Sequence, residues 1–168
     1  NVFGTYRYNV ISFTNHQVHP GSASTFEDIS IRGIFCSKSG KEMEFDPLQS
    51  GGSSMALIWI DAPAVVSSLT ISDYHRTESV WPAENIVIEP EATVECLQMN
   101  NVSVINHTPG AIHVLTNNGM IGYLGMTGVY AKAEGDTTRG SVVSGSGVIR
   151  QQDRQNVFTV NVDPGLAK

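Results

Sequence analysis

This sequence of 168 residues lacks the hallmarks of several functional classes. Its only cysteines, Cys36 and Cys96, do not have the spacing of a metal site, so a cysteine-ligated zinc domain is not expected. Whether the two thiols form a disulfide stays open. Lys and Arg number 10 against 16 Asp and Glu, with no basic run. Nucleic-acid binding is therefore not expected, because it depends on cations that contact phosphates.

Long apolar runs and helical periodicity are also absent. The longest apolar run, Met55–Ile60, is far too short to span a bilayer, so no membrane insertion is expected. The chain has 7 Leu against 31 Val and Ile, and β-branched residues favour strands. We therefore predict an all-β fold. No initiator Met or signal peptide is visible, and we interpret the chain as a fragment of a longer protein.

The feature that is present is a short repeated phrase. Glu27–Ile34 aligns with Ser67–Tyr74 and with Asn100–His107, and Ala83–Pro90 is a fainter copy. Small polar residues precede an apolar-x-apolar triplet, and in three copies a corner residue (Gly, Asp or Asn) follows. Repeated strand-and-corner units stack to bury a face that none could bury alone. The sequence predicts one right-handed parallel β-helix, a solenoid over residues 1–168.

Loops interrupt this pattern at two places. Residues 37–54 and 75–83 form polar excursions, and long loops in compact domains are often functional. Residues 141–168 are predicted to form a short β cap or a segment that contacts another subunit.

Acidic residues at the ends of predicted strands are the candidate catalytic groups. Asp73 follows the strand Leu69–Ile71 and is the first choice, Asp61 is the second, and Glu89 is the third. Glycoside hydrolysis needs two carboxyl groups, and acids on adjacent rungs about 4.8 Å apart meet this need. The alternative is that the aspartates are corner residues with a backbone role.

Ligand contacts are predicted around the second excursion. The candidate substrate-binding residues are Trp81, Tyr74, His75, Arg76 and Glu78. Trp59 is expected in the core or at a subunit contact instead. Cys96 is expected to point inward with Val94. The five histidines have no ligand spacing, so neither a metal site nor a cofactor is predicted.

The phrases Phe26–Ile34 and Asn100–His107 resemble the pectate-lyase-like β-helix superfamily over residues 26–125. Within it the chain is most similar to bacteriophage tailspikes. That resemblance implies a homotrimer on the virion, outside the cell, that binds a bacterial surface polysaccharide and in many cases cleaves it. The chain departs from the family's enzymes, since it has no Asp-Asp pair and no clustered aspartates for Ca²⁺.

The function expected from these features is recognition of a surface polysaccharide, with depolymerisation by a hydrolase or lyase left open. Three alternatives remain. The chain is a non-catalytic stalk or cap of a spike, a monomeric secreted polysaccharide lyase or hydrolase, or a viral jelly roll. The internal repeat favours a solenoid over the jelly roll.

Overall fold

A computed structural model describes residues 2–4, 11–14, 23–38, 56–78, 84–107 and 111–165. This part of the chain contains strands and no helix. The five long strands are β3 (Thr25–Lys38), β5 (Val65–Glu78), β7 (Thr93–Asn106), β9 (Met120–Ala133) and β11 (Val148–Val160). The short strands are β1 (Val2–Gly4), β2 (Ile11–Phe13), β4 (Ile58–Ile60), β6 (Ile86–Ile88), β8 (Ile112–Asn117) and β10 (Gly140–Ser144).

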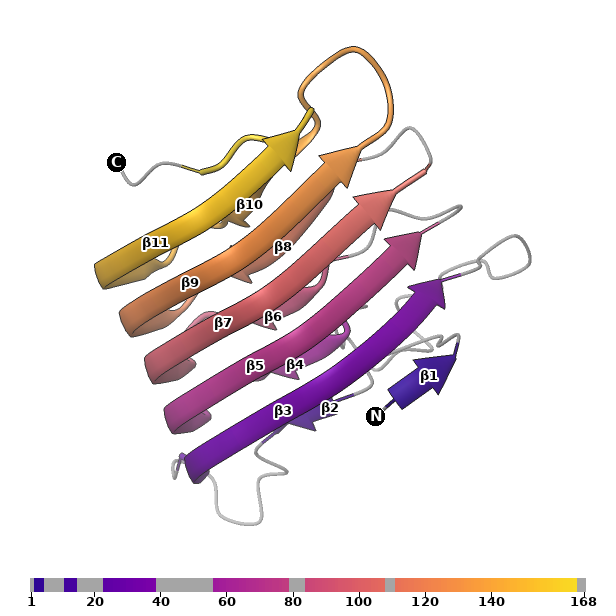
Figure 1. The fold of residues 1–168 in the computed structure, drawn as a ribbon. Helices are drawn as coiled ribbons and strands as arrows, with labels where there is room; N and C mark the ends of the chain where they lie inside the picture. Colours follow the sequence, from indigo (N-terminus) through magenta and orange to yellow (C-terminus); the bar gives the residue numbers. More distant parts are fainter. Residues whose placement is uncertain are drawn as a thin grey trace, which may run out of the picture.

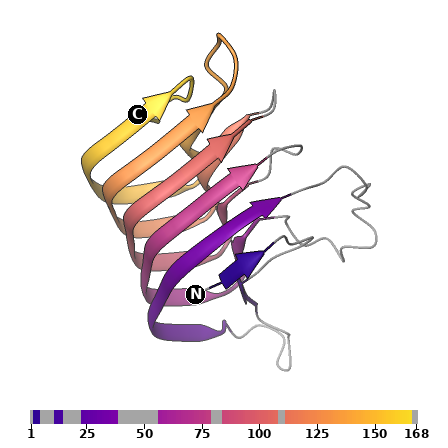
Figure 2. The same ribbon diagram turned by 45° about the vertical axis from the view of Figure 1, so that its right-hand side comes forward.

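The strands form two parallel sheets that face each other (Figure 1). In the described residues, one sheet has the order β1-β3-β5-β7-β9-β11 and the other β10-β8-β6-β4-β2. The chain alternates between them, so each long strand and one short strand make a coil of a solenoid (Figure 2). This confirms the predicted all-β parallel β-helix. It also excludes the jelly roll, whose strands are antiparallel.

A column of kinks bends every long strand at the same level. Gly33, Asp73, Asn101, Gly128 and Asn156 have φ between 53° and 75° and occupy equivalent positions on successive coils. Only Gly, Asn and Asp visit this left-handed region readily, which explains the residue types. The predicted corner residues Gly33 and Asp73 are thus confirmed as kinks, inside strands of 14 residues rather than at the ends of short ones.

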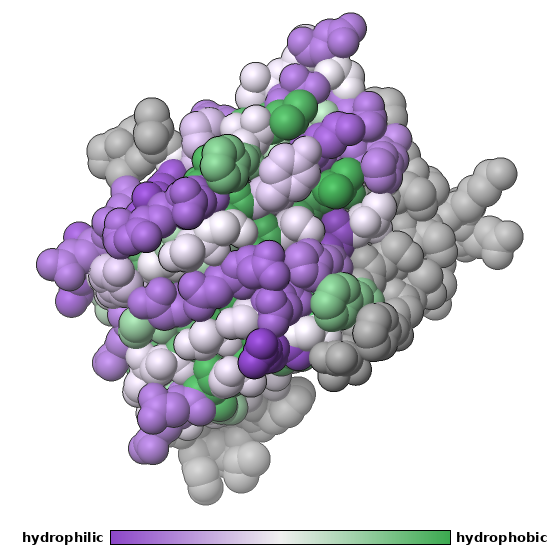
Figure 3. All heavy atoms as spheres, viewed as in Figure 1, coloured by the Kyte–Doolittle hydropathy of each residue, from purple (hydrophilic) through white to green (hydrophobic). Residues whose placement is uncertain are grey.

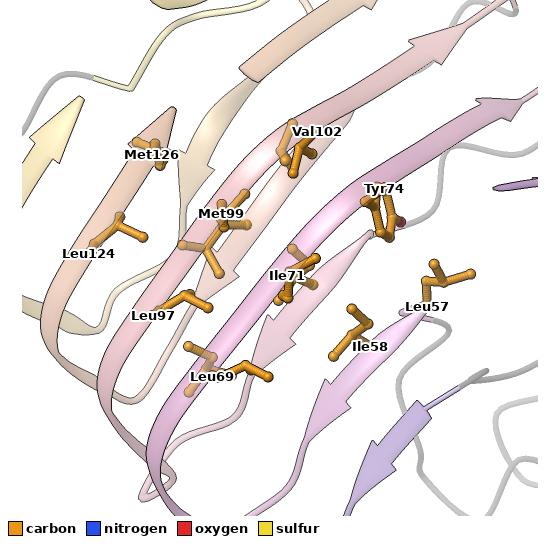
Figure 4. Packing of buried hydrophobic residues seen from close by; sticks show 14 of the residues in the cluster. Leu57, Ile58, Leu69, Ile71, Tyr74, Leu97, Met99, Val102, Leu124 and Met126 are labelled. Carbon is orange, nitrogen blue, oxygen red and sulfur yellow. The ribbon is translucent and has the colours of Figure 1, made fainter. Parts of the chain in front are cut away.

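The core lies between the two sheets and is built from columns of like residues (Figure 4). Leu69, Leu97 and Leu124 are paired in register on β5, β7 and β9, and all three are fully buried. Ile71, Met99 and Met126 form a second such column. Each coil therefore offers its neighbour an apolar surface of matching shape, and burial of that surface stabilises the stack.

The predicted alignment of the repeats is correct for one pair of coils. Glu27–Ile34 and Ser67–Tyr74 lie side by side in β3 and β5 as expected, with Ile29 opposite Leu69. The third copy is in the wrong register, because the structure pairs Leu69 with Leu97 rather than with Val102. The fourth copy is also misplaced, since Ile86–Ile88 is β6 in the other sheet.

Further expectations concern Cys96, the start of the second excursion and the last part of the chain. Cys96 is half-buried rather than inward. The alternation of buried and exposed side chains along β7 shifts at Glu95, so Val94 and Leu97 are the buried residues. Residues 75–78, predicted to begin a loop, belong to β5. Residues from 141 onward form most of β10 and all of β11, which continue the solenoid by pairing with β8 and β9. Their predicted role as a cap or subunit contact stays a prediction. None of the described segments is a helix of the length and hydropathy needed to cross a bilayer.

Candidate functional site

Asp73, the first catalytic candidate, lies in the column of kinks on the outer face of β5. Its Oδ2 accepts a hydrogen bond from Nε of Arg32 at 2.9 Å, and its Oδ1 accepts one from Nδ2 of Asn101 at 2.8 Å. These hydrogen bonds, from Asn101 first and Arg32 second, hold the pKa of Asp73 below its usual value. A general acid needs a raised pKa, so the site disfavours that role and suits an ionised carboxylate with a structural task.

Tyr74 and Arg76, predicted to bind substrate, point into the solenoid instead. The hydroxyl of Tyr74 donates to Oδ1 of Asn85 at 2.9 Å, and Nη1 of Arg76 donates to the same oxygen at 2.8 Å. Arg76 also donates to the carbonyl of Glu84 at 2.9 Å. With exposed fractions of 0% and 1%, the two side chains cannot stack on or pair with an external glycan. They tie the end of β5 to Glu84 and Asn85, directly before β6.

His75 faces outward and belongs to an aromatic column. Its ring stacks on that of Phe35, with centroids 4.9 Å apart and planes 28° from parallel, and Nδ1 lies 2.7 Å from Oγ of Ser103. Tyr130 and Phe158 continue the column on β9 and β11, in register with Ser103. The outer-face column thus runs Phe35, His75, Ser103, Tyr130, Phe158.

The outer-face column crosses a surface that is otherwise polar. Figure 3 shows the outer face of the long sheet, where hydrophilic and intermediate residues surround separate hydrophobic side chains. Phe158 is 63% exposed, whereas Phe35, His75 and Tyr130 are partly exposed. A polar column runs parallel to it, three residues earlier on each strand: Arg32, Ser72, Asn100, Thr127 and Gln155.

The other two catalytic candidates meet at a corner of the solenoid. Asp61 and Glu89 directly follow Ile60 and Ile88, which pair in register, so the two acids occupy neighbouring coils. Nε1 of Trp59 donates to Oε1 of Glu89 at 2.9 Å, and Oδ1 of Asp61 accepts from the backbone N–H of Ala62 at 2.9 Å. All three side chains are partly exposed, so Trp59 is not a fully buried core residue.

The predicted residues therefore divide between separate places. Asp73 lies eight residues along β5 from Val65, roughly 26 Å of strand, and does not join the corner acids. Trp81 and the side chain of Glu78 lie outside the described residues. In the part of the chain that the structure describes, no three His, Cys, Asp or Glu side chains are grouped to hold a metal ion.

Sequence reasoning missed Phe35, Tyr130 and Phe158. The signal that identifies them is their spacing, since each stands two positions after a kink residue, as His75 and Ser103 do. This spacing becomes visible only once the kink residues are aligned. The residues that flank Phe35, Tyr130 and Phe158 in the sequence differ from one strand to the next, so no repeated motif marks the three aromatics.

The fold and these surfaces define the protein as a parallel β-solenoid. A scan against protein-family models found no matching family, and searches of curated proteins and of solved structures found no significant match. The described structure confirms the expected β-helix, whereas the pectate-lyase-like and tailspike assignments stay predictions.

Proposed function

We propose that this solenoid recognises an extended bacterial surface polysaccharide along the outer face of its long sheet, as a homotrimeric, tailspike-like appendage. The observation that carries the proposal is the outer-face column. Aromatic faces bind the apolar C–H faces of sugar rings through dispersion and burial of area. A column of such rings parallel to the solenoid axis suits a linear polymer rather than a small compact ligand.

Ser103 gives the outer-face column its specificity in this proposal. It replaces an aromatic ring between His75 and Tyr130, which are two coils apart, or about 9.6 Å. A sugar ring can enter such a gap and lie against an aromatic face. The parallel polar column, with Arg32 and Asn100 among its members, supplies hydrogen-bond donors and acceptors for hydroxyl groups beside it.

The test fills the gap. Ser103→Phe completes the aromatic column, which favours folding through aromatic pairs across neighbouring strands, but it closes the gap to a sugar. We expect the variant to stay folded and to lose most retention on immobilised capsular and O-antigen polysaccharides. Tyr130→Ala should also lower retention, whereas Thr70→Ala, an outward change on β5 away from the column, should not. Unchanged retention by Ser103→Phe would show that the column is structural only.

The corner formed by Trp59, Asp61 and Glu89 favours a second candidate, hydrolysis of the glycan. Carboxyl groups about 5 Å apart suit a retaining mechanism, and acids on adjacent coils have about this spacing. The indole N–H of Trp59 orients Glu89. In this candidate Asp61→Asn and Glu89→Gln each abolish the release of reducing ends, while polysaccharide retention on the outer face persists. Asp73→Asn serves as the control, because it lies away from the corner. Release that survives both corner substitutions would eliminate this candidate.

A further inference from the structure

Two inward columns of the solenoid change from apolar to polar in the last described coil. Gln152 pairs in register with Leu124, in the column whose lower members are Leu97 and Leu69. Arg154 likewise follows Met126 in the column of Met99 and Ile71. Strand β11 therefore presents polar side chains where β5, β7 and β9 present buried hydrophobic ones.

These residues line a cavity of about 570 Å³ at the end of the solenoid, between β10, β11 and the segment that follows β11. This volume lies within the range of small-molecule sites. Val143 and Ile149 give the cavity an apolar wall, and the polar lining includes Asn117, Gln152, Arg154 and Asp163. Figure 1 shows β10, β11 and the C-terminal segment together at this end of the stack.

The guanidinium of Arg154 is held in place before any ligand arrives. Its Nε donates to Oε1 of Gln152 at 3.0 Å, and its Nη1 donates to the carbonyl of Pro164 at 2.6 Å. Asp163 is fixed as well, because its Oδ1 accepts the backbone N–H of Gly165 at 2.8 Å. Fixed polar groups lower the conformational cost of binding a ligand.

Asn117 forms a fixed part of the cavity wall. The residue is 2% exposed, and its Nδ2 donates to the carbonyl of Val148 at 3.2 Å. Its buried Oδ1 accepts no hydrogen bond from the described residues. Because this oxygen is closed off from solvent, Asn117 shapes the cavity wall through its fixed amide and does not offer an acceptor to a ligand.

We propose that this cavity binds one saccharide ring. A sugar hydroxyl both donates and accepts hydrogen bonds, which matches a lining that mixes the Gln152 amide, the Arg154 guanidinium and the Asp163 carboxylate. The one positive and one negative charge oppose each other, so a neutral ring fits better than a strong anion or cation. Val143 and Ile149 face its C–H groups. The ligand class rests on the proposed function, but the surface is a different one from the outer-face column.

The experiment records amide and side-chain NMR shifts of ¹⁵N-labelled protein while glucose, galactose, mannose or rhamnose is added singly. We expect at least one sugar to shift the signals of Asn117, Gln152 and Arg154, with a dissociation constant on the order of 1 mM. Gln152→Leu and Arg154→Met install the residues of the coils below and should abolish these shifts while leaving the protein folded. Gln155→Leu, an outward change on the same strand, should leave them intact.

Each outcome bears on this proposal separately from the proposed function. Absence of cavity shifts with all four sugars, or shifts that persist in both inward variants, would overturn the cavity site. Ser103→Phe should leave the cavity shifts unchanged, because Ser103 lies on the outer face of β7. Loss of polysaccharide retention in Ser103→Phe together with intact cavity shifts would support both proposals. Full polysaccharide retention together with loss of the cavity shifts would reject both.

Discussion

One residue in the column of kinks, Asp73, combines a backbone requirement with a charged side chain. Asp73 adopts φ of 53° and binds Arg32 and Asn101 through its two carboxylate oxygens. The type of residue at such a position could be predicted from the sequence, since a corner needs Gly, Asn or Asp. The partners could not, because Arg32 and Asn101 are 41 and 28 positions away and meet Asp73 only through strand register.

Acid should reveal the contribution of Asp73 to stability. Its pKa in the folded protein lies below the ordinary value of 3.8, so the ionised group stabilises the fold at all pH values above 3.8. This contribution is lost as the pH falls from 3.8 through the lowered folded pKa. We expect Asp73→Asn to have a lower urea midpoint than wild type at neutral pH, and the difference to shrink in acid. A difference that stays constant from neutral pH down into acid would contradict this assignment.

Asn85 should be among the most sensitive single residues. Its amide accepts from Tyr74 and Arg76 and donates to the carbonyl of His113 at 2.7 Å, all in the interior. Asn85→Ala leaves two buried donors and a carbonyl without this partner, which should lower the free energy of unfolding by about 3 kcal/mol or more. Tyr74→Phe removes one of the bonds and should cost about 1 kcal/mol. Urea unfolding measures both, and equal losses would contradict the shared role of Asn85.

Strands as elements were predictable, but their register was only partly so. The pattern of β5 and β7 repeats apolar residues at short intervals along 14 positions, as at Val94, Leu97, Met99, Val102 and Val104. A slip along such a strand still brings apolar residues face to face, so the hydrophobic pattern alone does not fix the pairing. The kinks fix it, because a residue with positive φ must stack on another that tolerates it. For the same reason the outer-face column stayed hidden in the sequence.

Gly140 controls the entry into β10. Its φ is 86°, and a Cβ atom at this position would overlap the carbonyl oxygen of Ile112 on the adjacent coil. Gly140→Ala should therefore loosen the pairing of β10 with β8, raising hydrogen exchange there while β5 and β7 keep their protection. Thr138→Ala, a change at an exposed position before β10, is the control. Unchanged exchange in β10 after Gly140→Ala would show that the backbone can adjust.

The whole molecule is a stack in which each coil contacts its direct neighbours. Stability in such a protein is close to a sum of coil and interface terms, so opening should begin at an end. We expect amide exchange to be slowest in β5, β7 and β9, which have long strands on both sides, and faster in β11, which has a paired neighbour only at β9 among the described strands. One uniform rate across all long strands would instead indicate a single cooperative unit.

Assembly is also a property of the whole molecule, and light scattering tests it. The proposed homotrimer would have a mass of three times 18.1 kDa. Val148 and Val160, both exposed on β11 and outside the outer-face column, give apolar area that subunits could bury. A stable trimer in solution supports the appendage proposal, whereas a clean monomer would favour a secreted, single-chain polysaccharide-binding protein.

The spacing of the coils has a consequence for how such a protein changes over time. Val65 and Thr93 are 28 positions apart, and so are Met120 and Val148, whereas Thr25 and Val65 are 40 apart although β3 and β5 pair in the same way. Additional sequence has thus been accommodated between two turns without altering the scaffold on either side. Exchange of segments between β3 and β5 should yield variants that recognise other ligands and keep the same solenoid. We expect this connection to vary most in evolution and to accept grafted sequences.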